Sequence, residues 1–308
     1  MEEQNNTINT NINNTVNPNI SSVPNVINNV NPLPLVSIVI PVHNGEKYIQ
    51  QALESCFTQS YSNYEVIVVD DKSTDMTVTL LKQYLSIHTN LKVILAEKQN
   101  GLGNVLNIGI KNSNPNAKYI ARMDADDIMY PKRLEKQVAY MEDHSDCVAV
   151  GGQVDIIDGD GHITGERKYA LEDGKIKGNM FIFSPFAHPA VMLRKDAVVQ
   201  IGYYPENIWK VEDVKFFFTL SKVGRFANIE DKVLKYRVTY KTESQSDILG
   251  HFKKTDEIRK WARSELHIEP TLKELIVWKI ESVGVRILSI FPEKFVMDVF
   301  GFVRKIFS

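Results

Sequence analysis

The sequence Tyr119-Ile-Ala-Arg-Met-Asp124-Ala-Asp126-Asp127-Ile-Met-Tyr-Pro131 joins an apolar segment to three closely spaced carboxylates. The apolar residues from Tyr119 onward predict a buried strand. If extended geometry continues past the strand, Asp124 and Asp126 point to the same side, because side chains alternate with a period of two. Crowded carboxylates repel one another, so the pattern favours a divalent cation with oxygen ligands and a phosphate-bearing substrate. The alternative is a solvated acidic turn before a helix that begins at Pro131.

The composition is that of an ordinary globular protein. The chain has 308 residues and a formal net charge of -2, which gives no indication of nucleic-acid binding. That length predicts one large domain, or one domain with an appendage. Cys56 and Cys147 have no metal-type spacing and fall in apolar segments, so we expect reduced core residues. We therefore expect a cytoplasmic protein, since no apolar segment approaches the length of a membrane span and no secretion signal is recognisable.

The chain divides into three regions by composition. Residues 1–34 are rich in Asn, nearly uncharged and poor in apolar residues, so we predict a disordered tail. Residues 35–249 contain the apolar runs and turn signals of a folded domain. Residues 250–308 have the amphipathic spacing of a helical C-terminal region.

Strands and helices alternate in the first half of the folded domain. Near-continuous apolar runs predict buried strands, and apolar residues three to four positions apart predict helices. The expected elements are strands at 35–41, 64–70, 91–95 and from 119, with helices at about 46–57, 76–85 and 103–110. This alternation predicts a parallel α/β sheet that binds ligands at the carboxyl ends of its strands. The acidic residues expected at that edge are Asp70, Asp71, Asp124 and Asp126.

Three motifs, in order and at suitable spacing, indicate a family. They are Val36-Ser-Ile-Val-Ile-Pro-Val-His-Asn44, Val68-Val-Asp-Asp-Lys-Ser-Thr-Asp75 and Arg122-Met-Asp-Ala-Asp-Asp127. Over about residues 35–240 the sequence resembles the family 2 glycosyltransferases, which have the GT-A fold. Further matching segments are Pro131-Lys-Arg-Leu134 with Gln137, Val211-Glu-Asp213 and Leu234-Lys-Tyr-Arg237.

The resemblance implies a nucleotide-sugar-binding half at residues 35–130. Asp126 is expected to hold a divalent cation, Mn²⁺ or Mg²⁺, with Asp124 at the ribose or in the metal shell. Asp71 would contact the nucleobase edge, and Asp70 would act indirectly; an Asx-turn and helix cap is the alternative for this pair. The implied nucleotide-sugar-binding residues are Pro41, Val42, Asn44, Asp70, Asp71, Asp124 and Asp126.

An acceptor half at residues 131–249 would complete a single fused GT-A domain. The resemblance implies that Asp213 is the catalytic base, which takes the proton of the sugar hydroxyl in an inverting displacement. The alternative for Glu212 and Asp213 is a favourable interaction with a helix dipole. His188 would border the acceptor, although a lone His is more often structural. Arg237 would lie near the diphosphate, or else form a local surface pair.

The C-terminal region lies outside the resemblance. Residues 250–308 contain eleven Lys and Arg against eight Asp and Glu, an excess of three positive charges. Two apolar stripes with helical spacing are Ile276, Ile280, Val283, Ile287 and Ile290, then Phe295, Val299, Phe302 and Ile306. The favoured interpretation is packing on the catalytic domain or on a partner in a homodimer. The alternative is peripheral contact with a membrane surface, where a lipid-linked acceptor would be found.

These patterns together predict a metal-dependent, inverting glycosyltransferase that uses a nucleotide diphosphate sugar, expected to be a UDP-sugar. The acceptor would be a hydroxyl of a glycan or lipid-linked saccharide, and the location cytoplasmic or on the cytosolic face of a membrane. A non-catalytic nucleotide- or carbohydrate-binding protein on the same fold is the competing hypothesis. A response-regulator receiver would leave residues 130–308 unexplained. A nucleotidyltransferase should show a phosphate cradle, which residues 42–46 lack.

Overall fold

The computed structural model describes residues 33–208, 210–239 and 248–288. Almost all of the predicted tail at 1–34 lies outside these residues. The second apolar stripe of the C-terminal region, at 295–306, also lies outside them. Predictions for both segments therefore remain predictions.

Strands and helices alternate along most of the described chain. The strands are β1 (Leu35–Val42), β2 (Tyr64–Asp70), β3 (Leu91–Leu95), β4 (Ala117–Arg122), β5 (Ile128–Met129), β6 (Cys147–Ile157), β7 (Ile163–Arg167), β8 (Met192–Arg194) and β9 (Arg225–Arg237). The helices are α1 (Ile49–Phe57), α2 (Thr77–Leu85), α3 (Leu102–Lys111), α4 (Arg133–Asp143), α5 (Asp173–Lys177), η1 (His188–Ala190, a 3₁₀ turn), α6 (Lys195–Gln200), α7 (Glu212–Leu220), α8 (Ile248–Leu266) and α9 (Leu272–Leu288).

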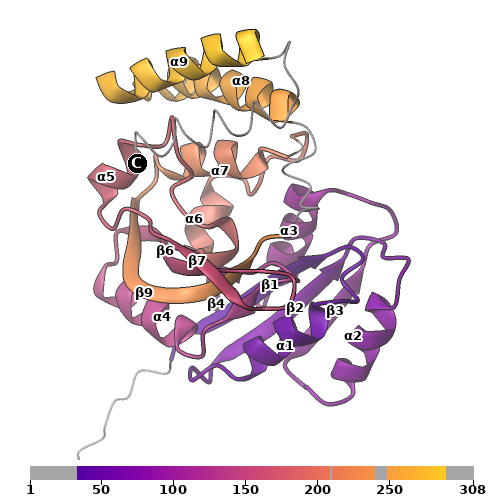
Figure 1. The fold of residues 1–308 in the computed structure, drawn as a ribbon. Coiled ribbons are helices and arrows are strands. Elements are labelled where there is room, and N and C mark those ends of the chain that lie inside the picture. Colours follow the sequence, from indigo (N-terminus) through magenta and orange to yellow (C-terminus); the bar gives the residue numbers. More distant parts are fainter. Residues whose placement is uncertain (1–32, 209, 240–247, 289–308) are drawn as a thin grey trace, which may run out of the picture. The chain divides into compact units, whose positions relative to one another are not determined.

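All of these strands belong to one mixed sheet with the order β3-β2-β1-β4-β8-β6-β9-β5, and β7 pairs with β6 (Figure 1). β1 lies between β2 and β4 and is parallel to both, and β3 continues the parallel part beyond β2. This confirms the predicted parallel α/β arrangement for the first half of the chain. In the second half β8 joins β4 in antiparallel orientation, and β6 pairs with β9 in parallel. The carboxyl ends of β1, β2 and β4 consequently meet at one edge.

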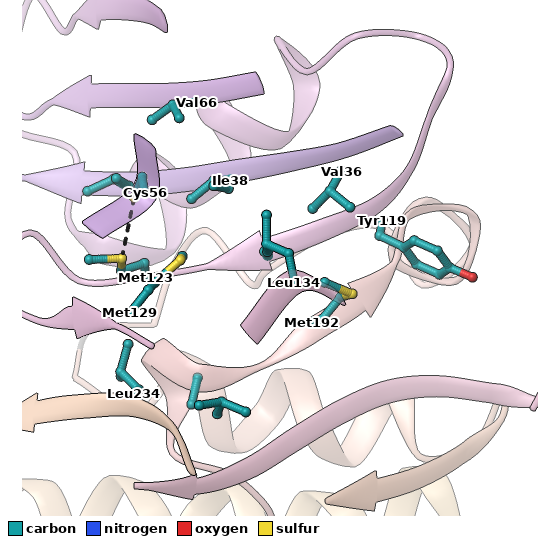
Figure 2. Packing of buried hydrophobic residues seen from close by; sticks show 14 of the residues in the cluster. Val36, Ile38, Cys56, Val66, Tyr119, Met123, Met129, Leu134, Met192 and Leu234 are labelled. Carbon is teal, nitrogen blue, oxygen red and sulfur yellow. Dashed lines mark hydrogen bonds between the residues drawn. The ribbon is translucent and has the colours of Figure 1, made fainter. Parts of the chain in front are cut away.

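Helices cover both faces of the sheet, as the apolar pattern of its strands requires. In β1, Val36, Ile38 and Ile40 belong to a core cluster that contains α1 and α4 residues, whereas Val39 belongs to a cluster with α3 residues. Alternating side chains of a strand point to opposite faces, so a near-continuous apolar run fits a strand buried on both. Figure 2 shows the first cluster, where Cys56 lies 3.7 Å (Sγ to Sδ) from Met123.

The prediction for the two cysteines is confirmed, the condition of the period-two argument is not met, and the start of one helix is corrected. Cys56 and Cys147 are buried free cysteines, as predicted, and β6 and β7 form an antiparallel hairpin. β4 ends at Arg122, so the period-two argument does not apply to Asp124. α1 begins at residue 49, three positions later than expected, because a turn precedes it.

Helix α8 packs against α7, α9 packs against α8, and both helices share the apolar core that contains α7. Ile258 and Ala262 of α8 and Trp278 of α9 are buried in the same cluster as Phe181 and Phe218. The described residues from Pro34 onward thus form one unit. Among the described residues, no helix is both long and apolar enough to cross a membrane.

The predicted packing of the first C-terminal stripe on the catalytic domain is wrong within the described part of α9. Ile276, Ile280 and Val283 are exposed, while Val277 and Trp278 on the opposite side are buried. Apolar residues lie on both sides of this helix, so their spacing alone does not determine which side packs. The stripe faces outward.

We expect that Gly109→Ala destabilises the fold, because α3 lies very close to the sheet at this point. A Cβ atom at residue 109 would lie 2.4 Å from a methyl group of Val39 and 3.3 Å from one of Val69. Overpacking of this kind costs about 1–3 kcal/mol, which exceeds the helical preference of Ala over Gly. Urea denaturation measures the difference. Gly174→Ala in α5 is the matched control, since its Cβ would meet nothing within 4 Å and should be neutral or stabilising.

Candidate functional site

The loops that follow β1 and β2 are bonded to each other at the carboxyl edge of the sheet. The Asp71 N–H donates to the carbonyl of Val42 at 2.7 Å, and the Thr74 N–H donates to Asn44 Oδ1 at 2.8 Å. Asn44 has a φ of 51°, a left-handed conformation that Asn tolerates better than most residues. The edge thus brings together Pro41, Val42, Asn44, Asp70 and Asp71, as the sequence predicted. Their contact with a nucleotide sugar stays a prediction.

Asp70 and Asp71 have different surroundings. Asp70 Oδ1 accepts the Ser73 N–H at 3.0 Å, whereas its Oδ2 is buried without a hydrogen-bond partner. The Asp71 carboxylate accepts the backbone N–H groups of Asn100 and Gly101 at 2.8 and 3.1 Å, at the start of α3. The turn alternative is therefore realised for Asp70, whereas Asp71 binds the backbone that precedes α3, and neither side chain caps α2. Asp71 fixes α3 against the end of β2.

The acidic segment after β4 forms a compact cluster. Carboxylate oxygens of Asp124, Asp126 and Asp127 all lie within 4.8 Å of one another. Asp124 forms a two-point ion pair with Arg122, with N···O distances of 2.7 and 2.8 Å. Asp127 is fully buried, and its Oδ1 accepts the Arg237 N–H at 2.8 Å while its Oδ2 has no partner.

This crowding changes the acidity of the cluster. Burial, together with the charge of Asp124, raises the pKa of Asp126 to about 6. Burial and the charges of Asp124 and Asp126 raise the pKa of Asp127 well above its ordinary value. Both shifts express a shortage of positive charge, which a divalent cation with oxygen ligands would relieve. The unpartnered Oδ2 of Asp127 points to the same need, so the donor set fits a hard cation.

Arg237, at the end of β9, donates its hydrogen bonds to protein acceptors. Its Nε donates to the carbonyl of Asp126 at 2.7 Å, and its Nη1 donates to the carbonyls of Asp158 and Gly159. Its Nη2 donates to Gln51 Oε1, and the side chain is buried. The alternative of a surface cation is wrong. Arg237 stabilises the acidic loop, and its predicted contact with the diphosphate stays a prediction.

Glu212 and Asp213 begin α7 beside the start of α3. A Cβ atom added at Gly103 would lie 3.4 Å from the side chain of Glu212, so the two helix starts are in close contact. Burial and the neighbouring Asp213 raise the pKa of Glu212 to about 7. Burial also raises the pKa of Asp213 above its ordinary value, while the charge of Arg122 lowers it. Both carboxyl groups thus lie within electrostatic reach of Arg122.

His188 lies in a polar and aromatic group behind the acidic residues. Its Nε2 is 2.9 Å from the Tyr204 hydroxyl, and burial lowers its pKa well below the ordinary value. Asn107 holds Tyr204 in place by two hydrogen bonds with its backbone, each 2.9 Å long. The charges of Asp213, Glu212 and Asp124 all raise the pKa of Tyr204, although burial is the larger cause. The imidazole is therefore bonded to a hydroxyl that lies within electrostatic reach of Asp124, Glu212 and Asp213.

Sequence reasoning missed two buried arginines. Arg122 was quoted only as part of a motif, yet its charge affects the pKa of Asp126, Glu212 and Asp213. Arg133 is buried, and its Nη1 and Nη2 donate to the carbonyls of Pro189 and Arg122 at 3.0 and 2.7 Å. The sequence did contain a sign of this for Arg122, since an Arg in an apolar strand is rarely buried without a specific partner.

Comparison with protein families decides the relationship. The model of glycosyl transferase family 2 matches residues 37–202. The chain belongs to glycosyltransferase family 2. An uncharacterised glycosyltransferase of Haemophilus influenzae is 32% identical, over 67% of this chain and 66% of its own length. The amylovoran biosynthesis glycosyltransferase AmsE of Erwinia amylovora is 32% identical, over 66% of this chain and 76% of its own length.

A solved structure supports the same fold. The S. aureus TarS 1–349 structure in complex with UDP-GlcNAc superposes with a TM-score of 0.55 and 20% identity. The superposition covers 82% of this chain and 80% of that chain. The predicted fold, a GT-A domain with a helical C-terminal part, is therefore confirmed for this member of glycosyltransferase family 2.

We expect that Glu212→Gln stabilises the protein at about pH 8. The pKa of Glu212 rises from 4.5 to about 7 on folding, so the stability from its bound proton is complete below about pH 4.5. That stability is lost as the pH rises through about 7. The destabilisation of the fold by the ionised Glu212 carboxylate amounts to about 3 kcal/mol at high pH and to less than about 1 kcal/mol near pH 5. Gln cannot ionise, so Glu212→Gln removes this destabilisation.

Urea denaturation at the two pH values measures this difference. Exposed Glu230→Gln is the control and should leave the free energy of unfolding unchanged at both. Equal stabilisation by Glu212→Gln at the two pH values would contradict the assignment.

Proposed function

We propose that this chain is a metal-dependent, inverting glycosyltransferase that transfers a sugar from a nucleotide diphosphate sugar to a hydroxyl acceptor. The observation that carries the proposal is the cluster of Asp124, Asp126 and Asp127 at the carboxyl edge of the parallel strands, together with the acidic pair Glu212 and Asp213 near it. Ligands of open α/β sheets bind at this edge. At this edge a carboxylate can act as the base while a cation in the cluster neutralises the charged leaving group.

Asp126, with Asp124 beside it, is the proposed ligand of Mn²⁺ or Mg²⁺. A bound cation of this kind supplies positive charge that neutralises the departing diphosphate. Asp124 forms an ion pair with Arg122, so this carboxylate is held in place before any ligand binds. Arg237 fixes the backbone of Asp126 through a 2.7 Å hydrogen bond. The protein thereby orders the loop that would receive the diphosphate.

Asp71, Asn44 and the end of β1 are the proposed nucleoside contacts. Asp71 is held against α3 by two backbone N–H donors, and a carboxylate has further lone pairs for a nucleobase edge. A uridine diphosphate sugar is the proposed donor, a choice supported by the UDP-GlcNAc complex of TarS.

Asp213 is the proposed base. Its pKa lies above the ordinary value, and a stronger base accepts the proton of a sugar hydroxyl more readily. Glu212 and His188 lie on the proposed acceptor side. Because one carboxylate acts opposite the leaving group, the displacement inverts the anomeric centre without a covalent intermediate.

The proposed acceptor is a glycan or a lipid-linked saccharide, in line with a relative named for amylovoran biosynthesis. The proposed location is the cytoplasm or the cytosolic face of a membrane, where nucleotide sugars and a lipid-linked acceptor can meet.

Release of nucleotide diphosphate from a panel of nucleotide sugars, with Mn²⁺ or with chelator, tests the proposal. We expect release from one donor that the chelator abolishes. Because many acceptor-dependent enzymes hydrolyse donors slowly, donor binding is measured beside release. Absence of both would support the non-catalytic binding protein on this fold.

Asp126→Ala should abolish metal-dependent donor binding. We expect the donor Kd with Mn²⁺ to rise at least about 100-fold, since even outer-shell partners of a metal contribute 10–100-fold. Isothermal titration with the nucleotide sugar that the panel identifies measures the change in donor Kd. The control is Asp160→Ala, which alters the second group of possible metal ligands, Asp158, Asp160 and His162. Unchanged binding by Asp126→Ala would contradict the metal assignment.

Asp213→Asn should leave donor binding within about twofold and lower kcat by roughly 10²–10⁴, the usual contribution of a general base. The amide keeps the shape of the side chain and cannot accept the proton. Steady-state transfer to an acceptor and donor titration are measured on the same preparation. Retained transfer would assign the base elsewhere, with Glu212 as the next candidate.

A further inference from the structure

The outward face of α9 is apolar and basic in the part of the helix that the structure describes. Four large apolar side chains on this face are strongly exposed: Leu272 (74%), Ile276 (47%), Ile280 (45%) and Val283 (56%). Their spacing of four, four and three residues places them along one side of the helix. Lys273 and Lys279 are exposed on the same side.

The carboxylates of α9 point the other way. Glu274 is 1% exposed and accepts the Phe181 N–H at 2.9 Å, and Glu281 is 4% exposed and forms a 2.9 Å ion pair with Arg259. This is the reverse of a helix that faces water, since burying a carboxylate is costly and an exposed isoleucine forgoes its hydrophobic stabilisation. Exposed apolar side chains and buried carboxylates on α9 are expected if the outward face of this helix contacts an environment less polar than water.

A basic groove borders this stripe. It lies between α8 and α9, has a volume of about 450 Å³, and is lined by the cations Lys253, Lys260, Arg263 and Lys279 and by Phe252, Leu275 and Trp278. Its one carboxylate, Asp256, is neutralised by Lys260 at 2.7 Å and accepts the indole N–H of Trp278 at 2.6 Å. Arg263 forms an ion pair with Glu269 at 2.8 Å, so Lys253 and Lys279 give the groove its net positive charge. Lys279 belongs to both the groove and the stripe.

We propose that α8 and α9 form a membrane-docking surface for anionic phospholipid. The stripe of Leu272, Ile276, Ile280 and Val283 would enter the interface between headgroups and acyl chains, and the groove would hold lipid phosphate groups. A helix with an apolar side and basic residues beside it has this mode of binding. A second copy of the chain fits this face less well, because a two-fold contact would bring its positive charges together.

The rest of the fold makes this surface rigid. α8 is anchored on α7 through Ile258 and Ala262, and Lys215 of α7 lies 4.5 Å over the Trp261 ring. Lys222 at the end of α7 donates to the carbonyl of Leu266 at 3.1 Å. These contacts attach α8 to α7.

Flotation of the full chain with vesicles tests the proposal. We expect binding to vesicles that contain phosphatidylglycerol, little binding to phosphatidylcholine alone, and a loss of binding as salt is raised. Ile276→Asp with Ile280→Asp should abolish flotation, because the apolar contact is replaced by negative charge. Lys253→Ala with Lys279→Ala should weaken binding roughly 25-fold, since each cation near an anionic surface contributes about fivefold.

The matched control is Ile87→Asp, which alters an apolar side chain that is 72% exposed in the loop between α2 and β3. It should float like the unmodified protein. Circular dichroism and thermal unfolding check that each variant is folded. The inference is overturned if the unmodified chain does not float, or if the folded α9 variant floats equally well. It is also overturned if size-exclusion light scattering shows a dimer that Ile276→Asp with Ile280→Asp dissociates while flotation is absent.

Discussion

The ion pair between buried Arg122 and half-buried Asp124 is the interaction on which the rest of the site depends. Asp124, Asp126 and Asp127 crowd together just after β4, and the charge of Asp124 raises the pKa of the other two. Arg122 is almost fully buried and offsets part of this repulsion, since its charge lowers the pKa of Asp126, Glu212 and Asp213. The remaining shortage of positive charge is visible in the raised pKa of Asp126. The proposed cation would supply this missing positive charge.

Two other buried arginines connect the second half of the chain to this edge. Arg237 at the end of β9 bonds to the acidic loop through its backbone N–H and its Nε, and Arg133 bonds to the carbonyl of Arg122 and to the segment around Pro189. Each side chain satisfies several carbonyls that would otherwise be buried without partners. The acidic loop is consequently fixed from both halves of the sheet.

The sequence was sufficient for features set by neighbouring residues and insufficient for those set by distant ones. The near-continuous apolar run of β1 predicted a strand buried on both faces, and acids at the strand ends predicted the edge of the site. The partners of Arg237 are about a hundred residues away in sequence, so no local pattern reveals that its side chain is used within the protein. In α9 the periodicity predicted a helix but not which side of it packs on the domain, because Trp278 on one side and Ile280 on the other are both large and apolar. Burial of the acids Glu274 and Glu281 decides between these sides, and burial is a tertiary property.

α7 links the two surfaces discussed above. Its first turn carries Glu212 and Asp213 within electrostatic reach of Arg122, and it holds α8 through Phe218 and the contact between Lys215 and Trp261. A helix of nine residues is only about 13 Å long, so the proposed base and the proposed membrane-docking surface are carried by one short rigid element. A lipid-linked acceptor has its reactive hydroxyl at a limited height above the bilayer. Docking through α8 and α9 would hold Asp213 at a constant height, and the geometry of α7 would then restrict which acceptors can reach the base.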